Sequence, residues 1–216
     1  MKPIALVAWI LLALVATGAA AQTSHTHRHD FSGAERWAKT FDDPARDRWQ
    51  KPHEVIRTLA VAPDALVADI GAGTGYFAAR LAHMTPRGRV FAVDVEPDMV
   101  EYLAARARRE NLPNLDAVRG KPDDPRLPVQ VDRVLVVDTY HHIDARPAYF
   151  ARLRGSLKPG AEVAIVDFTP DSPVGPPPSA RIPRKQVVDE MDRAGYALAA
   201  EHAFPPYQYF LVFRAR

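Results

Sequence analysis

The sequence predicts an α/β fold in which a mostly parallel, seven-stranded sheet carries helices on both faces and ends in an antiparallel hairpin. Three observations predict it. Short apolar runs alternate with amphipathic helical segments along most of the chain, which is the pattern of strand–helix–strand units. A glycine-rich turn follows the first apolar run, as in open α/β sheets that bind nucleotides. The last two strand-like segments leave no room for a helix between them, so they are expected to pair antiparallel.

The predicted elements follow one another in a regular order, with a helix first and a hairpin last. Strands are predicted at residues 65–70, 89–95, 115–120, 131–140, 161–168, 196–204 and 208–214, and helices at residues 53–61, 75–84, 97–111, 146–159 and 184–195. Residues 169–179 contain five prolines, so this segment can form neither a helix nor an interior strand. Because it follows a strand, it is expected on the ligand side of the sheet.

The composition suits one compact domain and excludes several kinds of function. The chain has 216 residues, of which 47% are hydrophobic, enough for a proper core. Its formal net charge of +2 gives no large basic field, so neither a nucleic-acid partner nor an obvious protein partner is expected. The lack of cysteine excludes disulfides, thiolate zinc sites and cysteine nucleophiles.

The N-terminus has the pattern of an export signal. Lys2 precedes an apolar run, and a stretch of small residues ends in three alanines before Gln22. The run is short for a membrane span, which needs about 20 apolar residues. We therefore predict a signal peptide at residues 1–21 and an exported protein, periplasmic or extracellular. The alternative is an uncleaved N-terminal membrane anchor, for which the single lysine favours a body outside the membrane.

Residues 22–48 are predicted to form a flexible tail and a lid in front of the main domain, which covers residues 49–216. Three histidines alternate in the polar tail, a pattern that fits either a flexible segment or a metal site: His25, His27 and His29. Beyond the tail, scattered aromatic side chains such as Trp37 and Phe41 indicate short helices packed on the larger body. We expect these helices and the proline-rich segment to flank the mouth of a site.

The stretch VADIGAGTGYF raises the question of what lies against its three glycines. Gly71, Gly73 and Gly75 permit a tight turn and a close approach to the backbone, and the following helix offers free amides. Their spacing differs from the dinucleotide fingerprint G-x-G-x-x-G. Asp69, just before the turn, would repel a pyrophosphate but suits a ligand with an ammonium group.

Residues 67–82 resemble motif I of the class I S-adenosyl-L-methionine-dependent methyltransferases. Asp94 resembles the acid with which this family binds both ribose hydroxyls, and later segments resemble its fourth strand (VDRVLVVDTYHHI) and fifth strand (LRGSLKPGAEVAIVDF). The resemblance covers roughly residues 49–214. It implies a Rossmann-like methyltransferase fold, S-adenosyl-L-methionine as the cofactor, and methylation of an acceptor. The nearly neutral net charge and the aromatic mouth favour a small-molecule acceptor.

The resemblance also implies a set of cofactor-binding residues: Asp69, Gly71, Gly73, Gly75, Asp94, Asp123 and Asp138. Among these residues, Asp123 matches the family's pattern least directly. Similar family members often have an acid right after a glycine at the end of the third strand, where this chain has Lys121. Asp123 would have to be carried in by the loop, and the alternative is that it is a turn residue.

Candidate catalytic residues follow the fourth strand: Tyr140, His141 and His142. Either histidine can act as a base, since imidazole titrates near neutrality; otherwise one caps the next helix and the other packs. Asp138 and Asp167 resemble the magnesium positions of catechol-type methyltransferases. Those enzymes have an amide next to the second acid, where this chain has Phe168, so no metal is predicted.

Two other functions compete with a methyltransferase. An oxidoreductase of Rossmann type is disfavoured by the glycine spacing and the closing hairpin. A non-catalytic exported protein could keep the fold and bind a nucleotide or a metal. Export itself favours this second alternative, because S-adenosyl-L-methionine is made in the cytosol.

Overall fold

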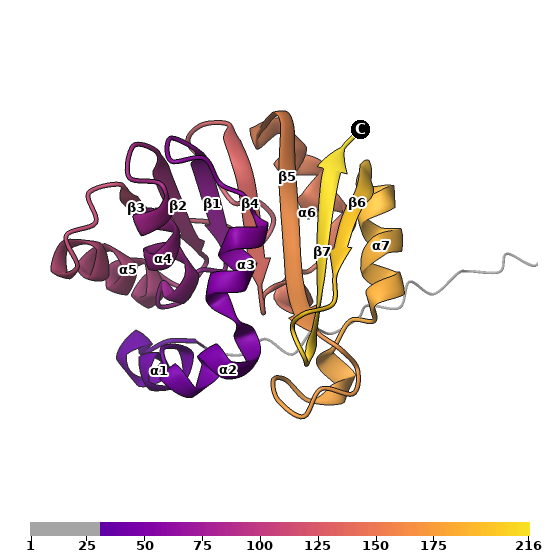
Figure 1. Cartoon of the computed structure of the whole chain (residues 1–216), viewed down its shortest axis with the longest axis horizontal. Helices are drawn as coiled ribbons and strands as arrows, with labels where there is room; N and C mark the ends of the chain where they lie inside the picture. The colour runs from indigo at the N-terminus through magenta and orange to yellow at the C-terminus, as the bar shows by residue number, and fades with distance from the viewer. Residues whose placement is uncertain (1–30) are drawn as a thin grey trace, which may run out of the picture.

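The computed structural model describes residues 31–216, which form one sheet with helices on both faces (Figure 1). Its strands are β1 Leu66–Ile70, β2 Arg89–Asp94, β3 Leu115–Arg119, β4 Val131–Val137, β5 Leu157–Phe168, β6 Tyr196–His202 and β7 Gln208–Ala215. They are arranged in the order β3-β2-β1-β4-β5-β7-β6. The first five strands pair parallel, and β7 pairs antiparallel with both β5 and β6. The predicted parallel sheet with a closing antiparallel hairpin is confirmed.

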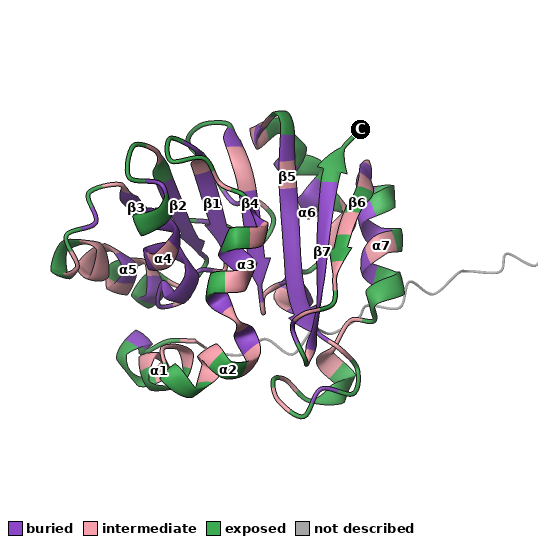
Figure 2. Ribbon diagram, viewed as in Figure 1, coloured by how far each residue is buried: buried purple, intermediate pink, exposed green. Residues whose placement is uncertain are grey.

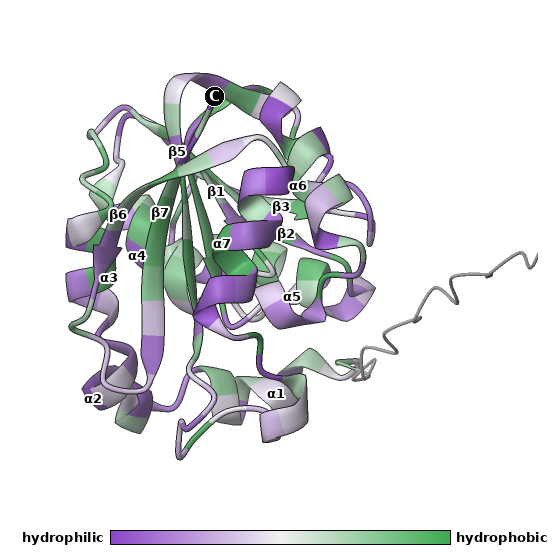
Figure 3. Ribbon diagram, turned by 90° about the vertical axis from the view of Figure 1, so that its right-hand side faces the viewer, coloured by the Kyte–Doolittle hydropathy of each residue, from purple (hydrophilic) through white to green (hydrophobic). Residues whose placement is uncertain are grey.

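Seven α-helices surround the sheet in the described part of the chain. They are α1 Ala34–Phe41, α2 Asp47–Gln50, α3 Pro52–Thr58, α4 Tyr76–Met84, α5 Pro97–Arg109, α6 Arg146–Leu153 and α7 Arg184–Arg193. Side chains of α3, α4 and α5 belong to one buried core, and those of α6 and α7 to another. Figure 3 shows α3 and α4 on one side of β5 and β7 and α6 and α7 on the other. The helices therefore cover both faces, as predicted.

The central strands are apolar on both faces because each face supports a core. Neighbouring residues of a strand point to opposite faces. Thus Leu135 of β4 packs with the α3–α5 side, while Val134 and Val136 pack with the α6–α7 side. Figure 2 shows the central strands buried along most of their length. This double burial explains why the strands read as nearly continuous apolar runs in the sequence.

The predicted helix at residues 146–159 is wrong in its second half. Helix α6 ends at Leu153, a 3-10 turn covers Arg154–Ser156, and β5 begins at Leu157. Leu157 is buried and pairs with Val131 of β4 across an irregularity in register. Pro159 could not have continued a helix, because its ring clashes with the preceding turn.

The carboxyl ends of the parallel strands meet at one edge of the sheet. Figure 1 shows α1, α2 and the proline-rich segment gathered below this edge. β1 lies between β2 and β4. From β1 the chain continues through β2 and β3 on one side, and then returns to form β4 and β5 on the other side of β1. In open α/β sheets such a switch point opens a crevice for ligands.

Two predictions lie outside the described residues, namely the signal peptide at residues 1–21 and the histidine tail with His25, His27 and His29. Export therefore stays a prediction. Among residues 31–216, none of the helices combines the length and the apolar character needed to cross a bilayer.

We expect Leu135→Ala to lower the free energy of unfolding by about 2–5 kcal/mol, because it leaves a cavity in a well-packed core. Leu135 is fully buried, at 0% exposure. Leu198→Ala on edge strand β6, where the leucine is 38% exposed, is the matched control and should cost less than about 1 kcal/mol. Urea unfolding measures both, and equal losses would contradict the assignment of β4 to the centre of the sheet.

Candidate functional site

A cavity of about 490 Å³ lies at the carboxyl ends of β1, β2 and β4. Its walls come from the glycine-rich turn after β1, from α1 and from the segments after β4 and β5. A second cavity of about 630 Å³ adjoins it on the β3 side, and Gly71, Asp94 and His142 line both. The switch point of the sheet is therefore hollow, as strand order predicts.

The glycine-rich turn needs glycine at each of its three predicted positions. Gly71, Gly73 and Gly75 have φ values of 72°, 54° and 91°, in the left-handed region that side chains disfavour. A Cβ on Gly71 would collide with Thr139, and one on Gly73 would lie 3.3 Å from the ring of Phe41. Gly71 and Gly73 line the cavity. Gly75 does not line it: it is the N-cap residue of α4, and a Cβ there would lie 2.9 Å from the side chain of Leu103 on α5.

Asp94 is the last residue of β2, and backbone groups hold its carboxylate in place. Its Oδ2 accepts a hydrogen bond of 2.9 Å from the N–H of Gly73, and its Oδ1 accepts one of 2.9 Å from the N–H of Glu96. Burial raises the pKa of Asp94, and these two N–H groups oppose that shift without cancelling it. Each oxygen keeps a further lone pair for a hydroxyl donor, so the carboxylate suits a vicinal diol.

Asp69 is buried in β1 and lines the same cavity. Burial, and then the nearby charge of Asp94, raise its pKa to about 7. The carboxyl group of Asp69 therefore changes between its protonated and ionised forms near neutral pH. A cation in the cavity would favour the ionised form, since an opposite charge at short range lowers the pKa of an acid.

Asp138 follows β4 and also lines the cavity, with its backbone in the left-handed region at φ 53°. Its carboxylate accepts hydrogen bonds from Arg46, at 2.7 Å, and from the side chain of Gln208. Burial raises its pKa to about 6 against the opposing charge of Arg46. A non-glycine residue in this conformation is costly and is typical of functional sites.

Arg46 connects the N-terminal segment to the site, a role that was not predicted from the sequence. Its guanidinium lies 4.4 Å from the ring centre of Tyr76 and 5.9 Å from that of Trp49. It also donates 2.9 Å to the carbonyl of Phe41. The guanidinium of Arg46 thus contacts Asp138, the rings of Tyr76 and Trp49, and the end of α1.

The three candidates after β4 point in different directions, because they form a 3-10 turn, Tyr140–His142, with three residues per turn. His141 and His142 line the cavity. Tyr140 does not line it: its buried hydroxyl donates 2.7 Å to Glu190 on α7. The geometry gives Tyr140 a structural place and leaves the two histidines as candidates.

Of the predicted cofactor residues, Gly75 and Asp123 do not line the cavities, and Asp123 is directed away from them. A tight turn between Lys121 and Asp124 carries it outward, where its side chain is 68% exposed and pairs with Arg152 at 3.1 Å. It lines neither of the two cavities. Its position fits the alternative interpretation as a turn residue.

Asp138 and Asp167 do not share a metal site. The carboxylate of Asp138 binds Arg46, whereas that of Asp167 binds His141. Within residues 31–216 there is no group of three or more His, Cys, Asp or Glu side chains that could hold a metal ion.

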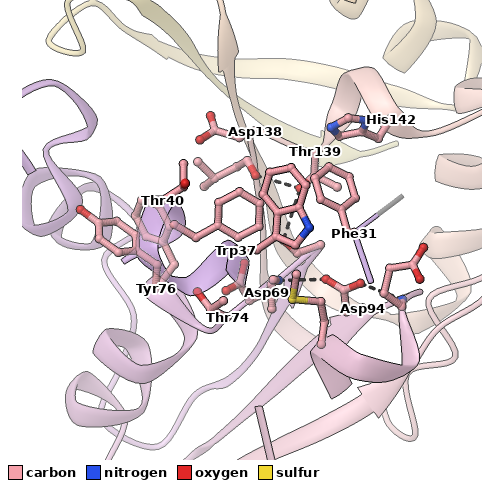
Figure 4. Close-up of a pocket in the computed structure, with 18 of the residues that line it drawn as sticks. Phe31, Trp37, Thr40, Asp69, Thr74, Tyr76, Asp94, Asp138, Thr139 and His142 are labelled. Atoms are coloured by element: carbon pink, nitrogen blue, oxygen red, sulfur yellow. Dashed lines mark hydrogen bonds between the residues drawn. The ribbon is translucent and has the colours of Figure 1, made fainter. Parts of the chain in front are cut away.

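The segment predicted to form a lid and the proline-rich segment both contribute residues to the wall of the cavity. Phe31, Trp37 and Phe41 form an aromatic cluster with ring centres 5.0–6.0 Å apart, and Figure 4 shows Trp37 among the acids of the cavity. Arg106 of α5 anchors α1, donating 2.9 Å to Asp42 and 3.0 Å to the carbonyl of Thr74. On the other side, Gly175 and Pro176 of the proline-rich segment line the cavity.

Comparison with known proteins points to a methyltransferase. Residues 67–160 match the family described as a methyltransferase domain. An uncharacterized methyltransferase of Mycobacterium tuberculosis is 35% identical over 132 residues, which are 60% of this chain and 51% of that protein. A malonyl-[acyl-carrier protein] O-methyltransferase of Hahella chejuensis is 31% identical over 97 residues, 45% of this chain and 34% of that protein. The chain thus spans about half the length of these curated relatives, or less.

Solved structures show the same fold. A SAM-dependent methyltransferase from Aquifex aeolicus superposes with a TM-score of 0.78 at 24% identity, over 86% of this chain and 98% of that one. The glycopeptide N-methyltransferase MtfA in complex with S-adenosyl-L-methionine gives a TM-score of 0.63 at 14% identity, over 76% of this chain and 87% of that one. Residues 67–160 thus match a methyltransferase domain, and the fold is that of the class I S-adenosyl-L-methionine-dependent methyltransferases.

S-adenosyl-L-methionine is the cofactor of this class, and the described residues fit it. The left-handed glycines leave the turn bare toward the cavity, and Asp94 offers a fixed carboxylate for ribose hydroxyls. The indole N–H of Trp37 and the hydroxyl of Thr74 are buried without a hydrogen-bond partner among residues 31–216, and both residues line the cavity. Polar atoms are thus available for a polar ligand.

We expect Arg106→Ala to loosen α1. It removes the donors to Asp42 and Thr74, so the amides of Ala34–Phe41 should exchange with deuterium roughly tenfold faster. Arg109→Ala is the control, because that exposed arginine reaches Glu110 at 3.9 Å and the ring centre of Tyr102 at 5.7 Å, which lie directly after α5 and in α5 respectively. Hydrogen exchange by mass spectrometry measures both variants, and unchanged exchange in Arg106→Ala would contradict the anchoring role.

Proposed function

We propose that this protein transfers the methyl group of S-adenosyl-L-methionine to a small-molecule acceptor. The observation that carries the proposal is the carboxylate of Asp94, held by two backbone N–H groups and open to both cavities. Two of the proteins named above carry an acceptor in their names, a malonyl-[acyl-carrier protein] and a glycopeptide. Because these acceptors differ, the comparisons support the reaction and not its substrate.

The chain's own residues would bind, orient and shield the reactants. When bound, the cofactor supplies a methyl group on a positively charged sulfur. Asp94 is placed to accept ribose hydroxyls, and Asp69 to pair with the ammonium group. The lid with Trp37 and Phe41 excludes water from the cavity, which matters because methyl transfer depends mainly on alignment and on a dry site.

The shape of the mouth supports a small acceptor. The lid closes one side of the cavity, and Gly175 and Pro176 close the other. Arg181 braces the proline-rich segment, donating 2.9 Å to the carbonyls of Pro176 and Pro170. The cavity between the lid and the proline-rich segment has a volume of about 490 Å³, which is in the range of small-molecule pockets.

We expect Asp94→Ala to weaken binding of S-adenosyl-L-methionine at least about tenfold, because hydrogen bonds to a charged group contribute about 1.5–3 kcal/mol. Asp116→Ala on the neighbouring strand β3 is the control, since Asp116 is exposed and pairs only with Arg89. Calorimetric titration measures both. A folded wild-type protein that does not bind the cofactor would refute the proposed function.

Binding should also release a proton from Asp69. Its pKa of about 7 in the free protein means that it is mostly protonated at about pH 6. The ligand's ammonium group lowers this pKa, so affinity should rise with pH up to about 7 and then level off. Titrations at about pH 6 in two buffers of different ionisation enthalpy measure the release. Asp69→Asn should reduce it and Asp116→Asn should not; equal release in both variants would contradict the role.

A further inference from the structure

His141 and Asp167 form a buried pair that is not among the residues proposed to bind the cofactor. The imidazole Nδ1 of His141 lies 2.9 Å from both carboxylate oxygens of Asp167, and the two side chains are 4% and 2% exposed. Backbone groups hold the carboxylate from the other side. The N–H of His141 donates 3.1 Å to Oδ2, and that of Phe168 donates 2.7 Å to Oδ1.

This contact fixes the orientation and the tautomer of the imidazole. A carboxylate accepts only, so Nδ1 carries the hydrogen and Nε2 keeps a lone pair. His141 lines the cavity, and Nε2 is the nitrogen left for a molecule that enters there. A base held by a carboxylate through its other nitrogen is the arrangement that activates a hydroxyl in nucleophilic catalysis.

The surroundings of the imidazole are apolar and aromatic on the side of the proline-rich segment. The ring of Phe168 lies 6.3 Å away, edge-on, and packs in turn on Trp49 at 5.9 Å. The ring of His142 lies 4.0 Å from that of His141. These flat surfaces suit an aromatic ring, which gains from offset or edge contacts.

The charges that face His141 are already paired inside the protein. Besides Asp167, they are Asp138, which holds Arg46, and Arg146, which binds Glu190. Burial lowers the pKa of His141, but the charge and hydrogen bond of Asp167 outweigh it, so the net shift is upward. The imidazole is thus a stronger base than a free one, and the charged groups around it have partners within residues 31–216, which favours an uncharged acceptor beside it.

We propose, on the basis of the proposed methyl transfer, that His141 is the general base, that Asp167 positions it, and that the acceptor is an uncharged aromatic compound with a hydroxyl group, a phenol. A carboxylic acid or a thiol would ionise with little help, and an aliphatic alcohol is too weak an acid for imidazole. A phenol lies between, where a base of this strength contributes most.

The step balances as follows. The hydroxyl proton moves to Nε2 of His141 while an electron pair of the oxygen forms the bond to the methyl carbon. The bond from that carbon to sulfur breaks, and its electrons stay on the sulfur as a neutral thioether. The positive charge ends on the imidazolium beside Asp167, and the proton later passes to water.

The test compares phenols of different acidity in His141→Gln. With para-methoxyphenol, the rate should fall roughly 10²–10³-fold, the range of a lost general base. With para-nitrophenol at about pH 9, where it is already ionised, the rate should change less than about threefold. His83→Gln is the control, an exposed histidine on α4 outside the cavity, and should leave both rates unchanged.

Asp167→Asn separates positioning from mere structure. The variant removes the charge that raises the pKa of His141. The rising limb of the pH–rate profile should therefore move to lower pH while the maximal rate falls. A purely structural role for Asp167 would lower the rate and leave the limb in place.

A readout without turnover uses para-nitrophenol bound in the presence of S-adenosylhomocysteine, which has no methyl group to transfer. In the wild-type protein, His141 accepts the phenol proton, so the absorbance of bound phenolate should appear at lower pH than in solution. This shift should be lost in His141→Gln. If His141→Gln does not fold, the absorbance shift in the wild-type protein alone still tests whether a base in the site accepts the phenol proton.

The outcomes are distinct. Selective loss with the less acidic phenol, together with the absorbance shift, supports the proposal. An equal fall with both phenols, or no absorbance shift, overturns His141 as the base. Cofactor binding without methylation of any phenol overturns the acceptor class and leaves the proposed function standing. A folded protein that binds no S-adenosyl-L-methionine overturns both.

Discussion

The structure depends on how four carboxyl groups are accommodated at one edge of a buried parallel sheet. Strand direction alone brings Asp69, Asp94, Asp138 and Asp167 there, and each charge is costly away from water unless it is compensated. Asp94 receives backbone N–H groups, Asp138 receives Arg46, and Asp167 receives His141. Asp69 responds instead through its pKa of about 7. Within the described part of the chain, Asp69 and Asp94 thus face the cavity without a side-chain partner of opposite charge, whereas the carboxylates of Asp138 and Asp167 are already paired with Arg46 and His141.

The position of the N-terminal segment follows from the same constraint. The side chain of Asp138 lies beside the cavity and is only 20% exposed, and the chain compensates its charge with Arg46 from the segment before α2. That guanidinium also contacts Tyr76, which belongs to the helix after the glycine-rich turn. The N-terminal segment is thus fixed by the charge of the site rather than by apolar burial alone. Its aromatic side chains then have a defined place at the mouth.

The sequence predicts the parts of this site that depend on local pattern. The strands were readable because burial on both faces makes them apolar throughout, and the turn because its left-handed positions require glycine. Contacts between distant segments were not readable: Arg46 meets Asp138 across 92 positions, and nothing near either residue marks the other. Direction was equally hidden, since a 3-10 turn sends Tyr140 to Glu190 and its neighbour His141 to the cavity.

Strand order separates the two tasks of the site. Asp94, on the β2 side of β1, resembles the acid of the family's cofactor motif, whereas on the other side His141 follows β4 and Asp167 lies near the end of β5. Under the proposed function, the acceptor therefore meets residues that the cofactor does not require. A change in the segments after β4 and β5 would alter the acceptor while the glycine-rich turn and Asp94 stay intact. The sheet makes this possible, because it positions the strand ends that carry Asp94 and Asp167, while the loops that follow the strands can vary.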